Sequence, residues 1–147
     1  MAHSRGLRIG RFPMAHGIYL VTFTTRNRQP VFNDFYVARA LIRCLNRSPH
    51  ARTLAYVVMP DHVHWLLQLT ESGALSSAIR AAKSLTTREA NRLRGDRGSI
   101  WQPGFHDRGV RHEADLKGIA RYIVANPLRA GLARRVGDYP HWDAIWV

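Results

Sequence analysis

The segment His62–Leu69 constrains the fold of this chain more than any other. Histidines stand at positions 62 and 64, and positions 63, 65, 67 and 69 hold valine, tryptophan and two leucines. Side chains two residues apart on a β-strand point to the same face of the sheet. The alternation therefore predicts a strand that turns an apolar face into the core and holds His62 and His64 side by side on the other face.

Two imidazoles on one rigid strand would form half of a site for a divalent metal ion, because neutral histidine nitrogens are common metal ligands. The motif is short, and two surface histidines on an amphipathic strand explain it equally well when it is taken alone. Asp61 precedes the pair and follows Pro60. We expect Asp61 to act as a turn former rather than as a hydrogen-bond partner of a histidine.

The second informative segment is Arg121–Leu132. Apolar residues at positions 116, 119, 120 and 123 form the stripe of an amphipathic helix, and Pro127 predicts that this helix ends at about Asn126. Tyr122 and Asn126 are spaced i and i+4, away from the centre of the stripe. A tyrosine there, next to an amide that can bind a cation, is a candidate nucleophile. A structural tyrosine at a helix end is the simpler explanation of this segment alone.

Propensity and turn residues predict the remaining elements. Strands are expected at 18–25 and 53–59, helices at 35–45 and 74–93, and one or two short strands between 100 and 111. Asn33 or Asp34 is expected to cap the first helix. The resulting order, β-α-β-β-α-β-α, indicates an α+β fold with a ferredoxin-like antiparallel sheet and helices packed mainly on one face. We expect one domain over residues 1–147, with residues 1–14 as a basic N-terminal arm.

The two motifs together resemble those of the single-tyrosine HUH transposases, and most of all those of the REP-associated tyrosine transposases. HUH denotes histidine, hydrophobic residue, histidine, which is His62-Val63-His64 in this chain. The second matching motif is the Tyr122–Leu132 segment. Further matching segments extend the resemblance over nearly the whole chain, at 16–24, 28–32, 101–107 and 138–144. The resemblance implies the same α+β fold, that of the HUH endonucleases.

The resemblance also implies the chemistry. Tyr122 would attack a DNA phosphate to give a 5′-phosphotyrosine and a free 3′-hydroxyl. His62, His64 and Asn126 would hold a divalent cation, with Mg²⁺ or Mn²⁺ implied as the working ion. The mixed nitrogen and oxygen donors would also admit Zn²⁺, Ni²⁺ or Co²⁺.

The implied protein is a metal-dependent endonuclease and strand transferase that acts on single-stranded hairpin DNA from repetitive extragenic palindromic (REP) elements. We expect a monomer, with a dimer left open. One alternative is a dimeric mobile-element transposase of the same chemistry. The other is a catalytically idle DNA-binding regulator.

Composition supports a nucleic-acid partner. The chain has 22 lysine and arginine residues against 10 aspartate and glutamate residues, a formal net charge of +12. Nearly all of these cations are arginine, whose guanidinium binds phosphate through two hydrogen bonds. A membrane surface or a G+C-rich genome would also raise the arginine content. The candidate DNA contacts are Arg5, Arg8, Arg11, Arg80, Lys83, Arg88, Arg92, Gln102 and Arg129.

Other polar and aromatic residues allow two interpretations each. His106 and Asp107 could line the active site or form a strand-edge pair bonded to its neighbours. Trp101, Trp142 and Trp146 could stack on unpaired bases, although core packing is the simpler role.

The sequence also bears on location. Cys44 is the only cysteine, which excludes an intrachain disulfide. No segment approaches the ~20 apolar residues of a membrane span, and the N-terminal residues lack the apolar region of a signal peptide. We therefore expect a cytoplasmic, bacterial-type location with nucleoid DNA as the substrate and no membrane partner.

Overall fold

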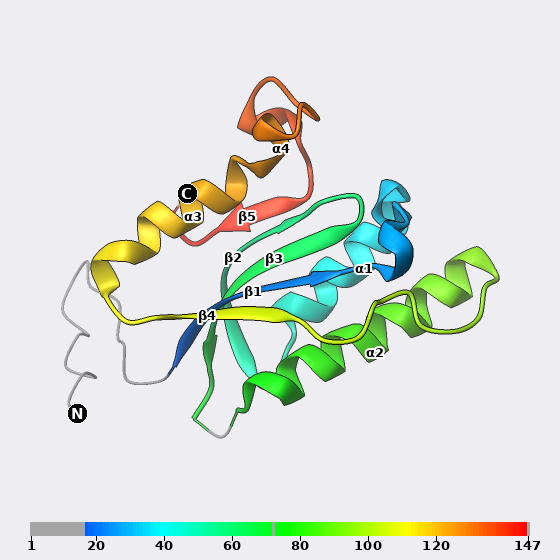
Figure 1. The fold of residues 1–147 in the computed structure, drawn as a ribbon, viewed down its shortest axis with the longest axis horizontal. Coiled ribbons are helices and arrows are strands. Elements are labelled where there is room, and N and C mark those ends of the chain that lie inside the picture. Colours follow the sequence, from blue (N-terminus) through cyan, green and yellow to red (C-terminus); the bar gives the residue numbers. More distant parts are fainter. Residues whose placement is uncertain (1–16, 72, 147) are drawn as a thin grey trace.

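Five antiparallel strands form one sheet in the order β4-β1-β3-β2-β5 in the computed structural model, which describes residues 17–71 and 73–146 (Figure 1). The strands are β1 (Ile18–Thr24), β2 (Ala51–Val58), β3 (His62–Leu69), β4 (His106–Val110) and β5 (Trp142–Ala144). The histidine strand, β3, lies in the middle of the sheet. The N-terminal arm expected at 1–14, with three of the candidate DNA contacts, lies outside the described residues.

The helices cover both faces of this sheet. They are α1 (Phe35–Asn46), α2 (Leu75–Arg94), α3 (Leu116–Val124) and α4 (Asn126–Arg129). The two longest, α1 and α2, pack against each other on one face, while α3 packs against β2 and β5 on the other. The α+β antiparallel fold expected from the sequence is confirmed, and α3 adds a layer on the second face. No helix in the described part of the chain is both long and apolar enough to cross a membrane.

The predicted alternation along β3 is confirmed, but both faces of the strand contribute to a core. Val63 and Trp65 are buried in the core beneath α1 and α2. Leu66 lies on the histidine face and is also fully buried, in a second core beneath α3. The face that carries the histidines is therefore mixed, since Leu66 joins the core beneath α3 whereas His62, His64 and Gln68 are polar.

Capping fixes the start of α1 as expected. The Asp34 side chain accepts hydrogen bonds from the backbone N–H groups of Tyr36 and Val37, at 2.9 and 3.3 Å. These bonds satisfy donors that have no partner inside the first turn of a helix. The first helix thus begins one residue after its cap, at the predicted position.

The end of the tyrosine helix differs from the prediction. Helix α3 ends at Val124, and Asn126 is the first residue of α4 rather than the end of the preceding helix. Pro127 lies in the first turn of α4. Proline is tolerated there because its missing N–H would have no helical acceptor. The proline therefore starts a new helix, with Tyr122 in the last turn of one helix and Asn126 at the start of the next.

The C-terminal segment forms an additional strand that was not predicted. β5 pairs with β2 at the edge of the sheet, so that Trp142 lies opposite Val57. The Tyr139 hydroxyl donates a 2.6 Å hydrogen bond to the Val58 carbonyl. Three residues are too few to show the period of a strand in the sequence.

Candidate active site

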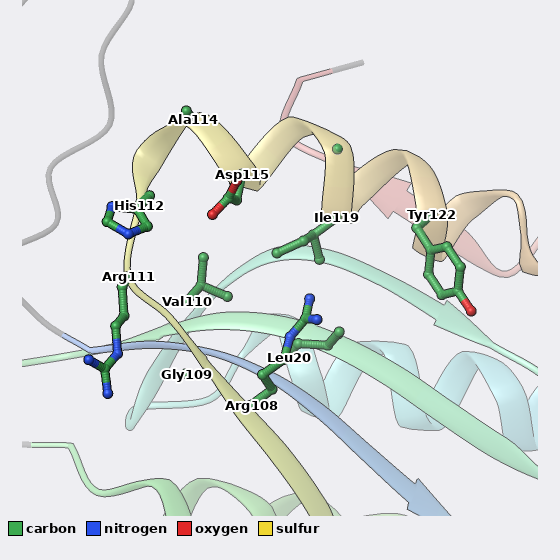
Figure 2. A pocket seen from close by; sticks show the side chains of 11 residues that line it. Leu20, Arg108, Gly109, Val110, Arg111, His112, Ala114, Asp115, Ile119 and Tyr122 are labelled. Atoms are coloured by element: carbon green, nitrogen blue, oxygen red, sulfur yellow. The ribbon is translucent and has the colours of Figure 1, made fainter.

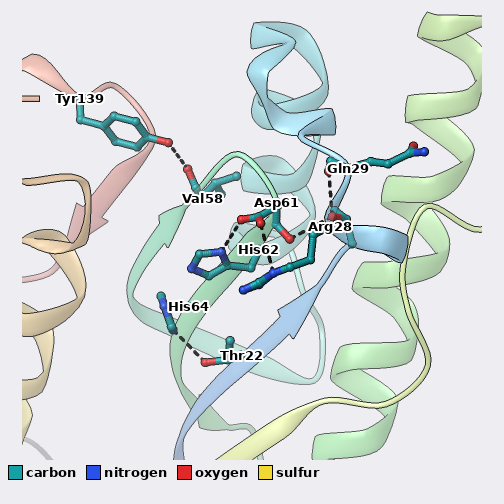
Figure 3. A network of polar contacts seen from close by, with 9 residues as sticks. Thr22, Arg28, Gln29, Val58, Asp61, His62, His64 and Tyr139 are labelled. Carbon is teal, nitrogen blue, oxygen red and sulfur yellow. Dashed lines mark hydrogen bonds and ion pairs between the residues drawn. The ribbon is translucent and has the colours of Figure 1, made fainter. Parts of the chain in front are cut away.

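His62 and His64 project side by side at the start of β3, as predicted. Their ring centroids are 4.9 Å apart and the rings meet edge to face. The Nδ1 atom of His62 lies 2.7 Å from Asp61 Oδ1, and Nδ1 of His64 lies 2.8 Å from Thr22 Oγ1 (Figure 3). Both Nδ1 atoms are thus engaged, which leaves Nε2 of each ring as the nitrogen that can bind a metal ion.

Asp61 does more than form the turn, which corrects the expectation from the sequence. Its second carboxylate oxygen lies 3.5 Å from the Arg28 guanidinium, so one carboxylate joins His62 to Arg28 (Figure 3). The turn places Asp61 directly against the first residue of β3. A carboxylate that accepts the Nδ1–H proton fixes the tautomer and the orientation of a metal-binding imidazole.

The environment of His64 keeps its ring neutral. Burial, the neighbouring His62 and the charge of Arg129 together lower the pKa of His64 from 6.5 to about 4. Each of these causes disfavours a positive charge on the ring. At neutral pH the imidazole therefore carries a free lone pair, as a metal ligand requires.

Tyr122 is exposed at the end of α3 and is held by Arg129. The side chain of Tyr122 is 59% exposed, so it is available to a substrate. The Arg129 guanidinium carbon lies 3.9 Å from the centroid of the Tyr122 ring. The same guanidinium donates a 2.6 Å hydrogen bond to the Tyr122 carbonyl. Arg129, a candidate DNA contact from the sequence, therefore also ties α4 to the tyrosine.

The tyrosine and the histidines lie on the same side of the sheet. Residues of α3, among them Ala120 and Ile123, pack on the face that also carries Leu66, two residues beyond His64. Arg129 stacks on Tyr122 and its charge acts on His64. Although the two motifs are far apart in the sequence, the fold thus gathers both at one end of β3.

Asn126 has an unsatisfied amide. Its Nδ2 atom is buried and has no hydrogen-bond partner among the described residues. The two ends of an amide have nearly the same shape, so rotation of the group would present Oδ1 in place of Nδ2. Within 17–71 and 73–146, no cluster of three or more His, Cys, Asp or Glu could hold a metal. The amide oxygen of an asparagine is a type of ligand that divalent cations accept.

His106 and Asp107 face opposite sides of the sheet. His106 pairs with Thr22 in the register of β1 and β4, and Thr22 pairs with His64. Directly paired residues share a face, so His106 lies on the histidine face. Asp107 pairs with Val21, whose side chain is buried beneath α1 and α2.

The basic residues of α2 lie on the face of the sheet opposite the histidines. Arg80 and Arg88 are exposed there. Arg92 forms an ion pair with Glu89 on the same helix. Any DNA that contacted these arginines and also reached Tyr122 would have to extend around the edge of the sheet.

Lys83 has a structural contact that the charge pattern did not reveal. Its ammonium donates to the backbone carbonyls of Gln102 and Gly104, at 3.1 and 2.6 Å. Burial lowers the pKa of Lys83. Lys83 therefore ties α2 to the loop before β4, while the Gln102 side chain remains exposed.

Comparison with known proteins gives a consistent picture. The family model of the IS200-like transposases matches residues 14–126, which include both histidines, Tyr122 and Asn126. A REP-associated tyrosine transposase of Escherichia coli K12 is 29% identical over 133 residues, covering 88% of this chain and 78% of that protein. A putative REP-associated tyrosine transposase of Haemophilus influenzae is 29% identical over 138 residues, covering 85% and 78%.

Solved structures agree with these relatives. The structure of a REP-associated tyrosine transposase bound to a REP hairpin superposes with a TM-score of 0.70 and 27% identity, covering 92% of this chain and 81% of that one. A putative transposase of Deinococcus radiodurans superposes with a TM-score of 0.57 and 25% identity, covering 80% and 95%.

Proposed function

Because the chain belongs to the family of IS200-like transposases, we propose that it cleaves and rejoins single-stranded DNA through a covalent bond to Tyr122. One observation carries the proposal. An exposed tyrosine and two histidines with free Nε2 atoms lie on the same side of the sheet, and Arg129 links them. Cleavage of a phosphodiester in this way requires a nucleophile, nitrogens that bind a metal ion, and a fixed positive charge.

In the proposed step the Tyr122 hydroxyl oxygen attacks the scissile phosphorus. The bond from phosphorus to the 3′-oxygen breaks, the phenol proton goes to water, and the leaving 3′-oxygen takes up a proton. The products are a 5′-phosphotyrosine and a free 3′-hydroxyl. A 3′-hydroxyl can attack the phosphotyrosine in turn, so the strand is rejoined without ATP because the phosphodiester has been exchanged rather than hydrolysed.

We propose that His62, His64 and Asn126 hold the divalent cation, Mg²⁺ or Mn²⁺. The free Nε2 atoms and the unsatisfied amide fit such an ion. When bound, the ion supplies positive charge next to the phosphate oxygens. Asp61 and Thr22 orient the two imidazoles toward it, and Arg129 adds a second positive charge beside the tyrosine.

The proposed substrate is a REP-type DNA hairpin. The structural relative at 27% identity was solved bound to a REP hairpin, and the net charge of +12 suits a polyanion. We propose that one chain acts as a monomer, since the described residues of a single chain supply the tyrosine and both histidines.

The test is a denaturing gel of REP hairpin DNA incubated with Mn²⁺ and either wild type or Tyr122→Phe. A label on the 3′ side of the scissile phosphate should shift to a protein–DNA adduct with wild type only. A label on the 5′ side should give a shortened free strand. Hairpin binding should be nearly equal for both proteins, because the substitution removes a single oxygen. Adduct formation by Tyr122→Phe would refute Tyr122 as the nucleophile.

A further inference from the structure

The turn of residues 25–29, between β1 and α1, holds an arginine in a conformation that side chains rarely adopt. Among the described residues, Asn27 and Arg28 are the two non-glycine residues with a positive φ, at 54° and 52°. Asparagine tolerates this left-handed region, whereas arginine is strained there because its Cβ atom crowds a backbone carbonyl oxygen. Glycine would remove that strain. The presence of arginine at position 28 therefore needs a reason that lies in its side chain.

Hydrogen bonds fix this turn against the start of β3. The backbone N–H of Thr25 donates to the Asp61 carbonyl at 2.9 Å. The Thr25 side chain is fully buried, and its hydroxyl shares its proton between the carbonyls of Gln29 and Asp61, at 2.8 and 3.0 Å. Because the Gln29 bond closes the turn around Arg28, the Arg28 backbone is held at a fixed position relative to Asp61.

From this position the Arg28 side chain contacts the Asp61 carboxylate. Arg28 Nε lies 3.5 Å from Asp61 Oδ2, while Asp61 Oδ1 lies 2.7 Å from His62 Nδ1 (Figure 3). The Arg28 and Asp61 side chains are 60% and 26% exposed, and an ion pair so open to solvent contributes less to stability than a left-handed arginine costs. Stability therefore does not explain the pair. Its effect is to engage the carboxylate oxygen that His62 leaves free, so that the carboxylate is held from both sides.

Arg28 belongs to the histidine side of the site and not to the tyrosine side. Tyr122 lies at one end of a groove between α3 and β4 (Figure 2). Of the described residues that line this groove, none belongs to the turn of residues 25–29. The cation that stacks on Tyr122 is Arg129. The two arginines thus act on different parts of the site, and a substitution of Arg28 leaves the contacts of Tyr122 in place.

We propose that Arg28 is a positioning residue, which holds the Asp61 carboxylate so that it accepts the Nδ1 proton of His62 and leaves the Nε2 lone pair for the metal ion. The strained turn keeps the guanidinium at that carboxylate. The inference rests on the proposed function, because it concerns how one of the metal-binding imidazoles is held. Arg28 acts through Asp61 and contacts neither the metal ion nor the scissile phosphate.

The first test follows the His62 tautomer by nitrogen NMR above neutral pH, without metal or DNA. Wild type should show His62 with its proton on Nδ1. Arg28→Ala should lose this single tautomer and show a mixture, because the carboxylate can then turn away from the ring. Arg28→Lys, which keeps a cation within reach of Asp61, should restore it. Arg26→Ala is the matched control, since Arg26 is an exposed arginine of the same turn without a positive φ.

The second test is a double-mutant cycle on Mn²⁺ affinity, measured by calorimetry without DNA. Arg28→Ala should weaken Mn²⁺ binding by about fivefold, less than the roughly 10–100-fold typical of a direct partner of a metal ligand. Arg28→Ala combined with Asp61→Asn should bind no more weakly than Asp61→Asn alone, because Arg28 acts through that carboxylate. Hairpin affinity in EDTA should fall no further for Arg28→Ala than for Arg26→Ala.

A glycine variant separates the side chain from the backbone conformation. Arg28→Gly should melt about 2–4 °C above Arg28→Ala, because glycine adopts the left-handed conformation without strain. Both variants should show the same loss of Mn²⁺ affinity, since both lack the guanidinium. Wild-type Mn²⁺ affinity in Arg28→Gly would show that only the backbone of the turn matters, and would overturn the proposal.

The remaining outcomes distinguish this proposal from the cleavage proposal. Additive losses in the cycle, or a single Nδ1–H tautomer in Arg28→Ala, would also overturn the role of Arg28. The NMR and calorimetry do not depend on DNA cleavage. If wild type forms no adduct but the tautomer change and the non-additive cycle are observed, the role of Arg28 stands and the cleavage proposal fails.

Discussion

At the scale of single residues, the hydrogen bonds at Nδ1 define the chemistry of the histidine pair. Asp61 and Thr22 each engage one ring, and both Nε2 atoms remain free. The neutral state of His64 follows from its burial and its cationic neighbour. These features make the pair suitable as metal ligands rather than as general acids.

Asp61→Asn should lower metal affinity, because the amide keeps the side-chain shape but loses the negative charge that holds the His62 tautomer. Partners of this kind typically contribute about 10–100-fold to metal affinity or activity. The Mn²⁺ concentration that gives half-maximal adduct formation should therefore rise by about 10–100-fold. Asp96→Asn, which changes an exposed carboxylate after α2, is the control. An unchanged midpoint for Asp61→Asn would show that His62 needs no carboxylate partner.

Arg129→Lys should slow adduct formation while leaving hairpin affinity within about threefold. Lysine keeps the charge but loses the planar group that stacks on Tyr122 and bonds its carbonyl. A loss of about tenfold in the single-turnover rate is expected, equal to ~1.4 kcal/mol of lost transition-state stabilisation. If the affinity for the hairpin fell while the rate at saturating DNA stayed the same, Arg129 would only bind DNA and would not act on the tyrosine.

Residue types and spacing predicted much of this site. The alternation of β3 was sufficient to place His62 and His64 together. The Thr22 partner of His64 could not be predicted from the sequence, because that bond depends on the pairing of β1 with β3. The Arg129 contact with Tyr122 depends on the α3–α4 junction, which the sequence pattern placed differently.

At the scale of elements, the sequence predicts the longer strands and helices and the short strand β4, which lies inside the expected range 100–111, but not the three-residue strand β5. The predicted helix at 35–45 corresponds to α1 and that at 74–93 to α2, each within one residue. β5 has too few residues to show a period, and it forms because β2 offers it an edge.

Tyr139→Phe tests how much the hydrogen bond from Tyr139 to β2 contributes to holding β5 and the segment before it against the sheet. The hydroxyl bonds the Val58 carbonyl, and burial raises the pKa of Tyr139 to about 12, so the phenol stays protonated at neutral pH. Removing this donor should lower the free energy of unfolding by about 1 kcal/mol, measured by urea denaturation. Tyr36→Phe, at a side chain 69% exposed, should have no effect. Equal stability of both variants would mean that the Tyr139 bond contributes nothing.

At the scale of the whole molecule, the sheet separates a face that serves only packing from a face that also carries the candidate active site. One face carries the core beneath α1 and α2, and the other carries a smaller core beneath α3 together with the histidines and the tyrosine. The net charge of +12 predicts DNA affinity in general. It could not distinguish arginines near the tyrosine from those on the opposite face, because that distinction depends on how the elements pack.

A single chain should be self-sufficient, since the tyrosine and the histidines of one chain lie on the same side of its sheet. A mixture of Tyr122→Phe with the His62→Ala, His64→Ala double variant should therefore form no adduct. Wild type mixed with either variant should retain adduct formation, which controls for inhibition. Adduct in the variant mixture would show that a second chain supplies the tyrosine, and would favour a dimeric transposase.

The most direct test of the central claim is to locate the covalent bond by mass spectrometry of the adduct formed with hairpin DNA, with and without EDTA. The chain has five tyrosines, so the position of the modification is informative. We predict a phosphonucleotide on the peptide that contains Tyr122, formed only when a divalent metal ion is available. A modification on another tyrosine, or an equal yield in EDTA, would contradict the account.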